Sequence, residues 1–270
     1  MIAIMMISMI YVMLTISVES MKRITEILDE EPSIVNPENP VLEVKDGSIE
    51  FRLVDYKYSA ESTKYALEGV NLKIESGMTV GVLGGTGSSK TTLVQLIPRL
   101  YDVTGGCVKF DGVDVRKLGL KQLRENVGIV TQETYLFNGT IRENLLYAKP
   151  DAKEEELIEA CKKANIHDFI LRQPQGYDTV LSEDGGSLSQ GQKQLLCIAR
   201  IMLCLPPMLI LDEATSSIDT RTEAIVQKGM DKLMEGRTVF VIAHRLSTVR
   251  NANAIMVLEN GEIIEKGDHE

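Results

Sequence analysis

The stretch "VGVLGGTGSSKTTLVQLI", residues 80–97, limits the fold of this chain more than any other feature. A short apolar run leads into a turn rich in glycine, then into a lysine with two threonines, and then into a second apolar run that reads as a helix. A glycine-rich turn between a buried strand and a helix directs backbone N–H groups at an anion. The stretch therefore predicts an α/β fold with a phosphate-binding loop over residues 84–92.

One position of this loop departs from the usual pattern, which runs Gly, four arbitrary residues, Gly, Lys and then Ser or Thr. Gly84, Lys90 and Thr91 match it, but Ser89 stands where the second glycine is usual. A left-handed backbone would cost a serine about 1–2 kcal/mol. A helix-start conformation would cost almost nothing, because serine is a favoured N-cap. We expect the helix-start conformation at Ser89, with a modestly altered affinity of the loop for its phosphate ligand. The alternative for the whole motif is a Ser/Gly turn beside an exposed lysine that binds no phosphate.

Three more short apolar runs accompany the one before the loop. They are "NVGIVTQ" at 126–132, "MLILDE" at 208–213 and "RTVFVIAH" at 237–244. Such runs are typical of parallel strands that are buried on both faces. Ligands of open α/β sheets bind beyond the carboxyl ends of the strands, so we expect the polar strand ends to form one site. These ends are Gly84, Gln132, Asp212 and His244.

Other segments alternate between apolar and polar residues and predict an antiparallel sheet. These are residues 47–58, 69–77 and 107–112. Residues from about 140 to 173 are helical in pattern, with an acidic first turn and basic residues later in "DAKEEELIEACKKAN". We expect this insert to form a lobe of its own.

The first eighteen residues, "MIAIMMISMIYVMLTISV", carry no charge. As a helix they would span roughly 27 Å at about 1.5 Å per residue, which nearly crosses a bilayer. A signal peptide would need a positive start and a small-residue cleavage site, and neither is visible. We expect the end of a membrane helix that continues into the cytoplasm; the alternatives are a buried core helix and a helix for oligomerisation.

Residues 29–40, "DEEPSIVNPENP", hold three prolines and four acidic residues, a composition that stops helices and favours an exposed connection. We therefore predict a membrane-helix end with its extension over residues 1–28, a linker over residues 29–40, and a domain over residues 41–270. The helical subdomain of that domain is expected at about 135–190.

Composition limits the kinds of partner and site that can be expected. The net charge of −10 and the pI near 5.0 leave no basic surface that would release counterions from a phosphate backbone, so nucleic acid is not expected as a partner. The four cysteines show neither C-x-x-C spacing nor a paired His cluster, which argues against a disulfide framework and a zinc site.

Two further motifs support a nucleotide site. In "PPMLILDEATSSID" an apolar run ends at Asp212, with Glu213 beside it, so that one carboxylate can hold hydrated Mg²⁺ while the other orients water. A plain helix cap is the alternative for this pair. In "SLSQGQKQ", Ser189 and Gly191 stand where a second helix begins and again present a helix start to an anion. Two such helix starts suggest a head-to-tail pair that shares ATP.

The order of these motifs resembles the nucleotide-binding domain of an ABC transporter, from about residue 41 to the end of the chain. Tyr58 matches the aromatic that stacks on adenine, residues 84–92 match Walker A, Gln132 the Q-loop, residues 188–192 the signature, residues 208–213 Walker B, residues 216–219 the D-loop and His244 the switch histidine. The first forty residues resemble the end of the last membrane helix of an exporter half-transporter and its linker. The implied fold is a P-loop NTPase (RecA-like) core with an antiparallel β subdomain and an inserted α-helical subdomain.

The resemblance also implies roles for single residues. The catalytic set would be Lys90 and Gln132, with Glu213 polarising water and His244 contacting the γ phosphate of ATP. Residues expected to bind ATP are Tyr58, Gly84, Gly85, Thr86, Gly87, Ser88, Ser89, Lys90, Thr91, Thr92 and Gln132. Thr91, Gln132 and Asp212 would approach Mg²⁺. Ser189, Gln190, Gly191, Gln192 and Asp219 would contact the ATP of the partner protomer. Tyr58 as an ordinary strand aromatic and His244 as a strand-end histidine remain alternatives.

The resulting hypothesis is an ABC exporter ATPase at the cell membrane, with its ATP-binding domain on the cytoplasmic side. Its partners would be a second ATP-binding domain, identical or different, and the transmembrane domains. The alternative is a degenerate-site regulatory half of a heterodimeric exporter with little hydrolysis of its own, which Ser89 motivates. A soluble ABC ATPase of DNA repair or translation would need a long coiled coil or a second cassette, and neither is present in the sequence. The cargo is not readable from these residues.

Overall fold

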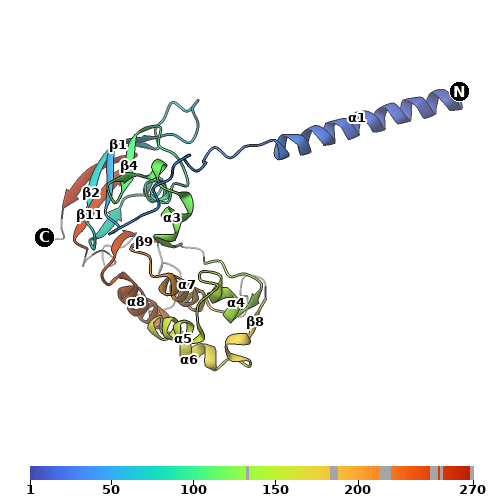
Figure 1. Ribbon diagram of the computed structural model, residues 1–270. Coiled ribbons are helices and arrows are strands. Elements are labelled where there is room, and N and C mark those ends of the chain that lie inside the picture. Colours follow the sequence, from blue (N-terminus) through green and yellow to red (C-terminus); the bar gives the residue numbers. More distant parts are fainter. Residues whose placement is uncertain (132–133, 183–187, 213–219, 244–248, 250–251, 268–270) are drawn as a thin grey trace. The chain divides into compact units, whose positions relative to one another are not determined.

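The computed structural model of the chain describes residues 1–131, 134–182, 188–212, 220–243, 249 and 252–267. The chain divides into two compact units, Met1–Val35 and Asn36–Glu270 (Figure 1).

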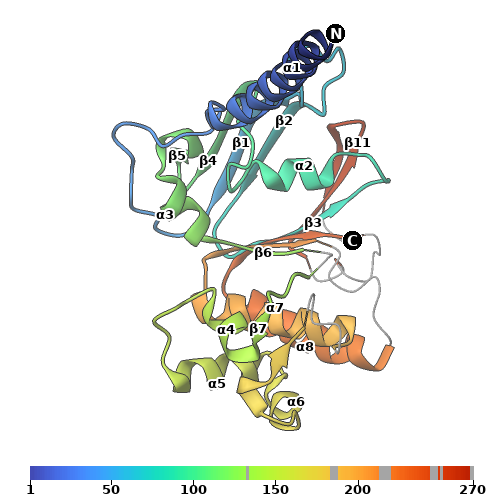
Figure 2. The same cartoon turned by 90° about the vertical axis from the view of Figure 1, so that its right-hand side faces the viewer.

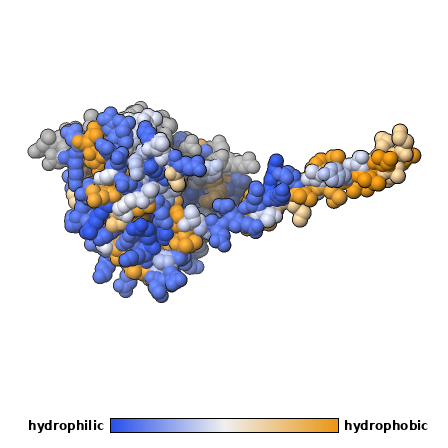
Figure 3. Space-filling model, turned by 90° about the horizontal axis from the view of Figure 1, so that it is seen from above, coloured by the Kyte–Doolittle hydropathy of each residue, from blue (hydrophilic) through white to orange (hydrophobic). Residues whose placement is uncertain are grey.

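The first unit is dominated by one helix, α1 (Ile2–Leu28), which is long and apolar enough to cross a membrane by length and composition. Apolar side chains gather along its N-terminal part (Figure 3). Two of its hydroxyl side chains are paired within the helix, where Thr15 and Ser20 donate to the carbonyls of Tyr11 and Ile16 at 2.9 and 3.0 Å. Such internal pairing suits a helix in an apolar environment, where no water could take its place.

The second unit is built on a six-stranded sheet in the order β12-β11-β3-β10-β9-β6. The four predicted runs form four of its parallel strands, β3 (Thr79–Leu83), β6 (Val127–Val130), β9 (Met208–Asp212) and β10 (Thr238–Ile242). This part of the prediction is confirmed.

Two strands of this sheet were not predicted. β11 (Ala254–Glu259) pairs parallel with β3, and β12 (Glu262–Gly267) pairs antiparallel with β11. Asn260 and Gly261 join them with φ of 50° and 88°. An Asn-Gly turn between alternating segments is a strong hairpin signal, so the sequence did contain the information.

Both faces of the parallel strands are buried, which explains their continuous apolar runs. On one face Leu209, Leu211, Val239 and Val241 belong to a core that they share with the helices. On the other face the alternate residues of the same strands, Met208, Ile210, Phe240 and Ile242, belong to a second core. Because successive side chains of a strand point to opposite faces, each run supplies both cores at once.

The second core is closed by an antiparallel sheet in the order β2-β1-β4-β5, as the alternating segments predicted. Its strands are β1 (Ile49–Tyr56), β2 (Leu67–Ile74), β4 (Gly105–Phe110) and β5 (Val113–Asp114). The helix α2 (Lys90–Gln95) lies on the same side of the six-stranded sheet (Figure 2). The short turn η1 (Val115–Lys117) and α3 (Leu120–Glu125) lead back to β6.

The helices on the other face surround the first core. α7 (Gln190–Cys204) and α8 (Thr220–Met234) lie beneath the six-stranded sheet (Figure 2). The predicted helical insert forms α4 (Ile141–Leu146), α5 (Glu154–Lys163) and α6 (His167–Leu171), with the turn η2 (Gly176–Asp178) and the short pair β7 (Gly139–Thr140) and β8 (Val180–Leu181). The insert shares its core with α7 and α8.

Candidate nucleotide-binding site

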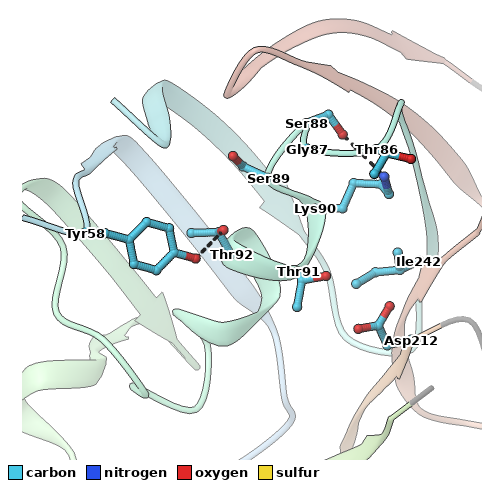
Figure 4. Close-up of a pocket in the computed structure, with 10 residues that line it drawn as sticks. All are labelled: Tyr58, Thr86, Gly87, Ser88, Ser89, Lys90, Thr91, Thr92, Asp212 and Ile242. Carbon is cyan, nitrogen blue, oxygen red and sulfur yellow. Dashed lines mark hydrogen bonds between the residues drawn. The ribbon is translucent and has the colours of Figure 1, made fainter. Parts of the chain in front are cut away.

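A cavity of about 590 Å³ opens at the carboxyl ends of β3, β9 and β10 (Figure 4). Its volume falls in the range of small-molecule sites, about 300–1,000 Å³. It is lined by Tyr58, Thr86, Gly87, Ser88, Ser89, Lys90, Thr91, Thr92, Asp212 and Ile242. Nine of these ten residues belong to the site predicted from the sequence, which the fold gathers from segments far apart in the chain.

Strand register explains why the carboxylate of Asp212 reaches this cavity. In the parallel ladder Asp212 lies opposite Ile242, and Ile242 lies opposite Val82. The loop starts directly after β3, so the ends of all three strands lie at one edge of the sheet. Parallel strands present all their carboxyl ends there, as expected for an open α/β sheet.

The Lys90 ammonium group is fixed by three hydrogen bonds. Its side chain folds back over the loop, and its Nζ donates to the carbonyls of Gly84 and Gly85 at 2.9 and 2.8 Å and to Ser88 Oγ at 3.4 Å. Only 6% of the residue is exposed. Burial lowers the pKa of Lys90, while the charge of Asp212 opposes that shift. The ammonium group is thus held beside the loop by neutral carbonyls.

Ser89 contradicts the expected helix-start conformation. It occupies the N-cap position of α2 with φ of 73° and ψ of 24°, which is left-handed, and its side chain makes no capping hydrogen bond. A left-handed residue beside right-handed ones turns successive N–H groups toward one concave face, the geometry of an anion-binding nest. The prediction was wrong because the loop, and not the helix that follows it, sets the backbone of this residue. Serine adopts it at a cost of about 1–2 kcal/mol.

The glycine at the start of the loop has no substitute. Gly84 has φ of 154°, and a Cβ at this position would lie 2.3 Å from the carbonyl oxygen of Leu258 and 2.5 Å from Ser88 Oγ. Backbone from β11 therefore closes over the point where the chain leaves β3. Gly87, with φ of 80°, has open space around it and is required for its conformation alone.

Tyr58 lies at one end of the cavity, and its hydroxyl is 2.7 Å from Thr92 Oγ1 (Figure 4). Its side chain is accessible, since 60% of the residue is exposed. It comes from the loop after β1, in the antiparallel sheet, whereas Thr92 belongs to α2. The tertiary structure therefore joins the predicted adenine-stacking residue to the phosphate-binding loop.

The donors around the cavity suit a magnesium–nucleotide pair. Lys90 and the loop backbone provide a cation and N–H groups for phosphates. Thr91 and Asp212 provide oxygen atoms of the kind that Mg²⁺ prefers, and Mg²⁺ takes few protein ligands when substrate phosphates supply the rest.

The predicted signature residues do not line this cavity. Ser189 is the N-cap of α7, with φ of −67° and ψ of 158°, and forms a capping box with Gln192. Gln192 N donates to Ser189 Oγ at 3.3 Å, and Ser189 N donates to Gln192 Oε1 at 2.9 Å. Gly191 is buried within α7, and the Gln190 amide donates to Thr134 Oγ1 at 3.3 Å.

Four of the predicted site residues lie outside the residues that the structure describes. They are Gln132, Glu213, Asp219 and His244. Ile242 was not predicted, although its place at the end of a buried strand, two residues before His244, is a signal that could have indicated it.

Comparison with known proteins gives one consistent result. A family model described as "ABC transporter" matches residues 67–216. An ATP-dependent lipid A-core flippase of Syntrophus aciditrophicus is 49% identical over 250 residues, which make up 92% of this chain and 41% of the flippase. A fatty acid ABC transporter ATP-binding/permease protein of Mycobacterium bovis is 44% identical over 252 residues, 93% of this chain and 40% of the relative.

The fold itself has a solved counterpart. A bacterial Atm1-family ABC exporter with ATP bound matches with a TM-score of 0.86 at 37% identity, over 97% of this chain and 46% of that one. The chain spans less than half the length of the curated relatives that it matches.

The family match covers more than half of the chain and includes the loop, Lys90 and the strand that carries Asp212. The sequence resemblance and the predicted P-loop fold are confirmed by it and by the solved exporter. This chain belongs to the ABC transporter family, whose ATP-binding domains are ATPases.

Proposed function

We propose that this chain binds Mg²⁺–ATP in the cavity beside residues 84–92 and hydrolyses it as the ATPase part of an exporter. The proposal rests on one observation: Lys90, the loop backbone and Asp212 line one cavity at the carboxyl ends of the parallel strands. The family match supports it. Oxygen-rich anions with a divalent cation are the chemistry that such a set of donors fits.

Lys90 would exchange its partners when ATP binds. Its three N–H bonds now go to two loop carbonyls and one serine hydroxyl. Phosphate oxygens are charged acceptors and form stronger hydrogen bonds with an ammonium than neutral carbonyls do. Because the lysine is already aligned along the loop, binding needs only a short movement of its Nζ.

Thr91, Asp212 and Gln132 would hold the metal ion, which neutralises charge on the phosphates when it is bound. Glu213, directly after β9, would orient the attacking water, and His244 would contact the γ phosphate. Asp219 would act across a dimer interface. These roles rest on the resemblance and on the place of each residue in the sequence.

The position of the helix start at Ser189 is an argument for a dimer. Its residues do not line the cavity that holds Lys90, yet the family resemblance assigns them to ATP. We propose a head-to-tail pair in which residues 189–192 of each ATP-binding domain close over the ATP of the other, whether the partner is identical or different. The relatives and the match to an ATP-bound exporter give no support to the degenerate-site alternative.

For the whole protein we propose coupled export across the cell membrane. The helix α1 would be the end of the last membrane helix, residues 29–40 a linker, and residues 41–270 the ATP-binding domain on the cytoplasmic side, with about 135–190 as its helical subdomain. The transmembrane domains would be its partners. Relatives with a similar ATP-binding domain are named for lipid A-core and for fatty acid, so the similarity of this domain does not identify a cargo.

Glu213→Gln tests the assigned reaction. We expect the variant chain to bind ATP as before, to lose hydrolysis by orders of magnitude, and to accumulate as an ATP-dependent dimer, because a neutral amide cannot polarise water as a carboxylate does. Turnover and dimerisation are measured by phosphate release and light scattering over a range of chain concentrations.

The matched control is Glu155→Gln, the same change at an exposed position of α5, which should leave turnover unaltered. Normal turnover by the Glu213 variant would show that another group activates water. Turnover that does not depend on chain concentration would contradict the head-to-tail pair.

A further inference from the structure

The accessible ring of Tyr58 contacts the rings of two other tyrosines. Its ring centroid lies 5.0 Å from that of Tyr56 and 5.5 Å from that of Tyr101, at interplanar angles of 78° and 83°. Tyr56 and Tyr101 are themselves 5.5 Å apart. Edge-to-face pairs at these distances are favourable and fix the orientation of a ring. Tyr56 is buried, whereas Tyr101 is 38% exposed.

The turn that carries Tyr101 is fixed by an ion pair within the turn and by hydrogen bonds from α3. Arg99 is almost fully buried and forms a two-pronged ion pair with Asp102, from Nε to Oδ1 at 2.7 Å and from Nη2 to Oδ2 at 2.9 Å. Arg124 of α3 donates to the carbonyls of Pro98 and Arg99 at 3.3 and 3.2 Å. Two-pronged arginine–carboxylate pairs give geometric definition as well as energy, so the place of Tyr101 is well defined.

The same turn is tied to the backbone that carries Tyr58. Thr104 N donates to the carbonyl of Asp55 at 2.8 Å, and Lys57 N donates to Thr104 Oγ1 at 3.1 Å. The loops of Tyr58 and Tyr101 therefore form one unit. The Tyr58 hydroxyl also pairs with Thr92 at 2.7 Å (Figure 4). The ring is therefore fixed by two aromatic contacts and by a bond at its hydroxyl, and the residue still lines the cavity.

We infer that Tyr101 is a positioning residue for nucleotide recognition: it holds the Tyr58 ring at the angle at which the base can stack on it. The inference rests on the proposed function, in which Tyr58 stacks on adenine. Tyr101 does not line the cavity, and it acts on the base through Tyr58. Its contribution is to reduce the orientational freedom that an exposed ring would lose on binding.

The test compares a ligand that has a base with one that has none. The affinities of the full chain for ATP and for inorganic tripolyphosphate are measured by calorimetric titration for the unaltered chain and for Tyr101→Leu, Tyr101→Phe and Tyr58→Ala. Leucine keeps an apolar side chain but removes the ring, and phenylalanine keeps the ring. Tyr147→Ala is the matched control, because Tyr147 forms an aromatic pair with Phe137 at 4.4 Å outside the cavity.

We expect Tyr101→Leu to weaken ATP binding about 2- to 10-fold, the equivalent of one aromatic pair, and to leave tripolyphosphate binding unchanged. Tyr101→Phe should bind both ligands as the unaltered chain does. In the Tyr58→Ala background Tyr101→Leu should have no further effect, because coupled residues are not additive.

Three outcomes would overturn the inference. Equal weakening for both ligands would show a general structural role for Tyr101, an unchanged ATP affinity beside a weakened Tyr58→Ala would show that Tyr101 is dispensable, and additive effects in the double variant would show independent action. Equal affinity of the unaltered chain for ATP and tripolyphosphate would instead contradict the proposed adenine role of Tyr58, which separates the two failures.

Discussion

The helices α2 and α7 both begin after a serine, and the two serines adopt opposite backbone conformations. Ser89 is left-handed and makes no side-chain capping bond, whereas Ser189 is extended and forms a complete capping box with Gln192. Both were predicted from the sequence as helix starts that face phosphates. The comparison shows that the same residue at the same position of a helix can be set by different parts of the structure.

The difference follows from what precedes each helix. The chain leaves β3 through Gly84, which is closely covered by backbone from β11, and must turn back within a few residues so that its N–H groups converge. Serine accepts the strained conformation because the loop demands it. At Ser189 the helix itself sets the conformation, and the extended backbone of an ordinary N-cap results.

The largest effect is expected when a lysine at the start of each helix is replaced and ATP binding is compared. Lys90→Met should weaken ATP binding by at least about 100-fold, because a charge-assisted contact with the phosphates is lost at a desolvated position. Lys193→Met, near the start of α7, should leave ATP binding by dilute chain unchanged. Titration of both variants at low chain concentration checks this, and an equal loss in both would mean that the two helix starts contribute to one site within a single chain.

The cap of α7 should be visible in stability. Ser189→Ala removes the acceptor for Gln192 N and should lower the free energy of unfolding by about 1 kcal/mol, whereas Ser189→Gly should cost only a few tenths. Urea unfolding of both variants measures this. If Ser189→Ala lowered the free energy of unfolding by less than Ser189→Gly does, the capping box would contribute nothing in solution.

Ser89→Gly should act in the opposite direction. Glycine adopts the left-handed backbone without strain, and its greater freedom in the unfolded chain offsets part of that gain, so we expect the free energy of unfolding to rise by about 0.5–1 kcal/mol. ATP affinity should change only several-fold or less. A loss of stability would show that the serine hydroxyl has a role that the backbone does not explain.

The smallest effect is expected for Ser89→Ala. Alanine shares the strain of serine in this conformation, and no capping bond is lost, so the free energy of unfolding should change by less than about 0.5 kcal/mol. The same substitution therefore costs about 1 kcal/mol at Ser189 and almost nothing at Ser89. Equal costs at both positions would remove the distinction between the two helix starts.

Much of the core was predictable because burial leaves a direct signal. The parallel strands are continuous apolar runs that feed one core on each face, and the antiparallel strands alternate. The β11–β12 hairpin was missed, although the Asn260–Gly261 turn marked it. Local pattern therefore indicated which segments form parallel and which form antiparallel strands, except where one turn signal was missed.

The site was predictable as a set of residue types but not as a geometry. The sequence alone determined the loop, its lysine and the carboxylate of Asp212 at the end of β9, because each is a short motif whose chemistry depends on neighbouring residues. The tertiary structure decided the rest: the left-handed backbone of Ser89, the retracted Lys90 and the joining of Tyr58, Tyr101 and Thr92. These features depend on contacts between residues far apart in the chain, and only the closed fold brings those residues together.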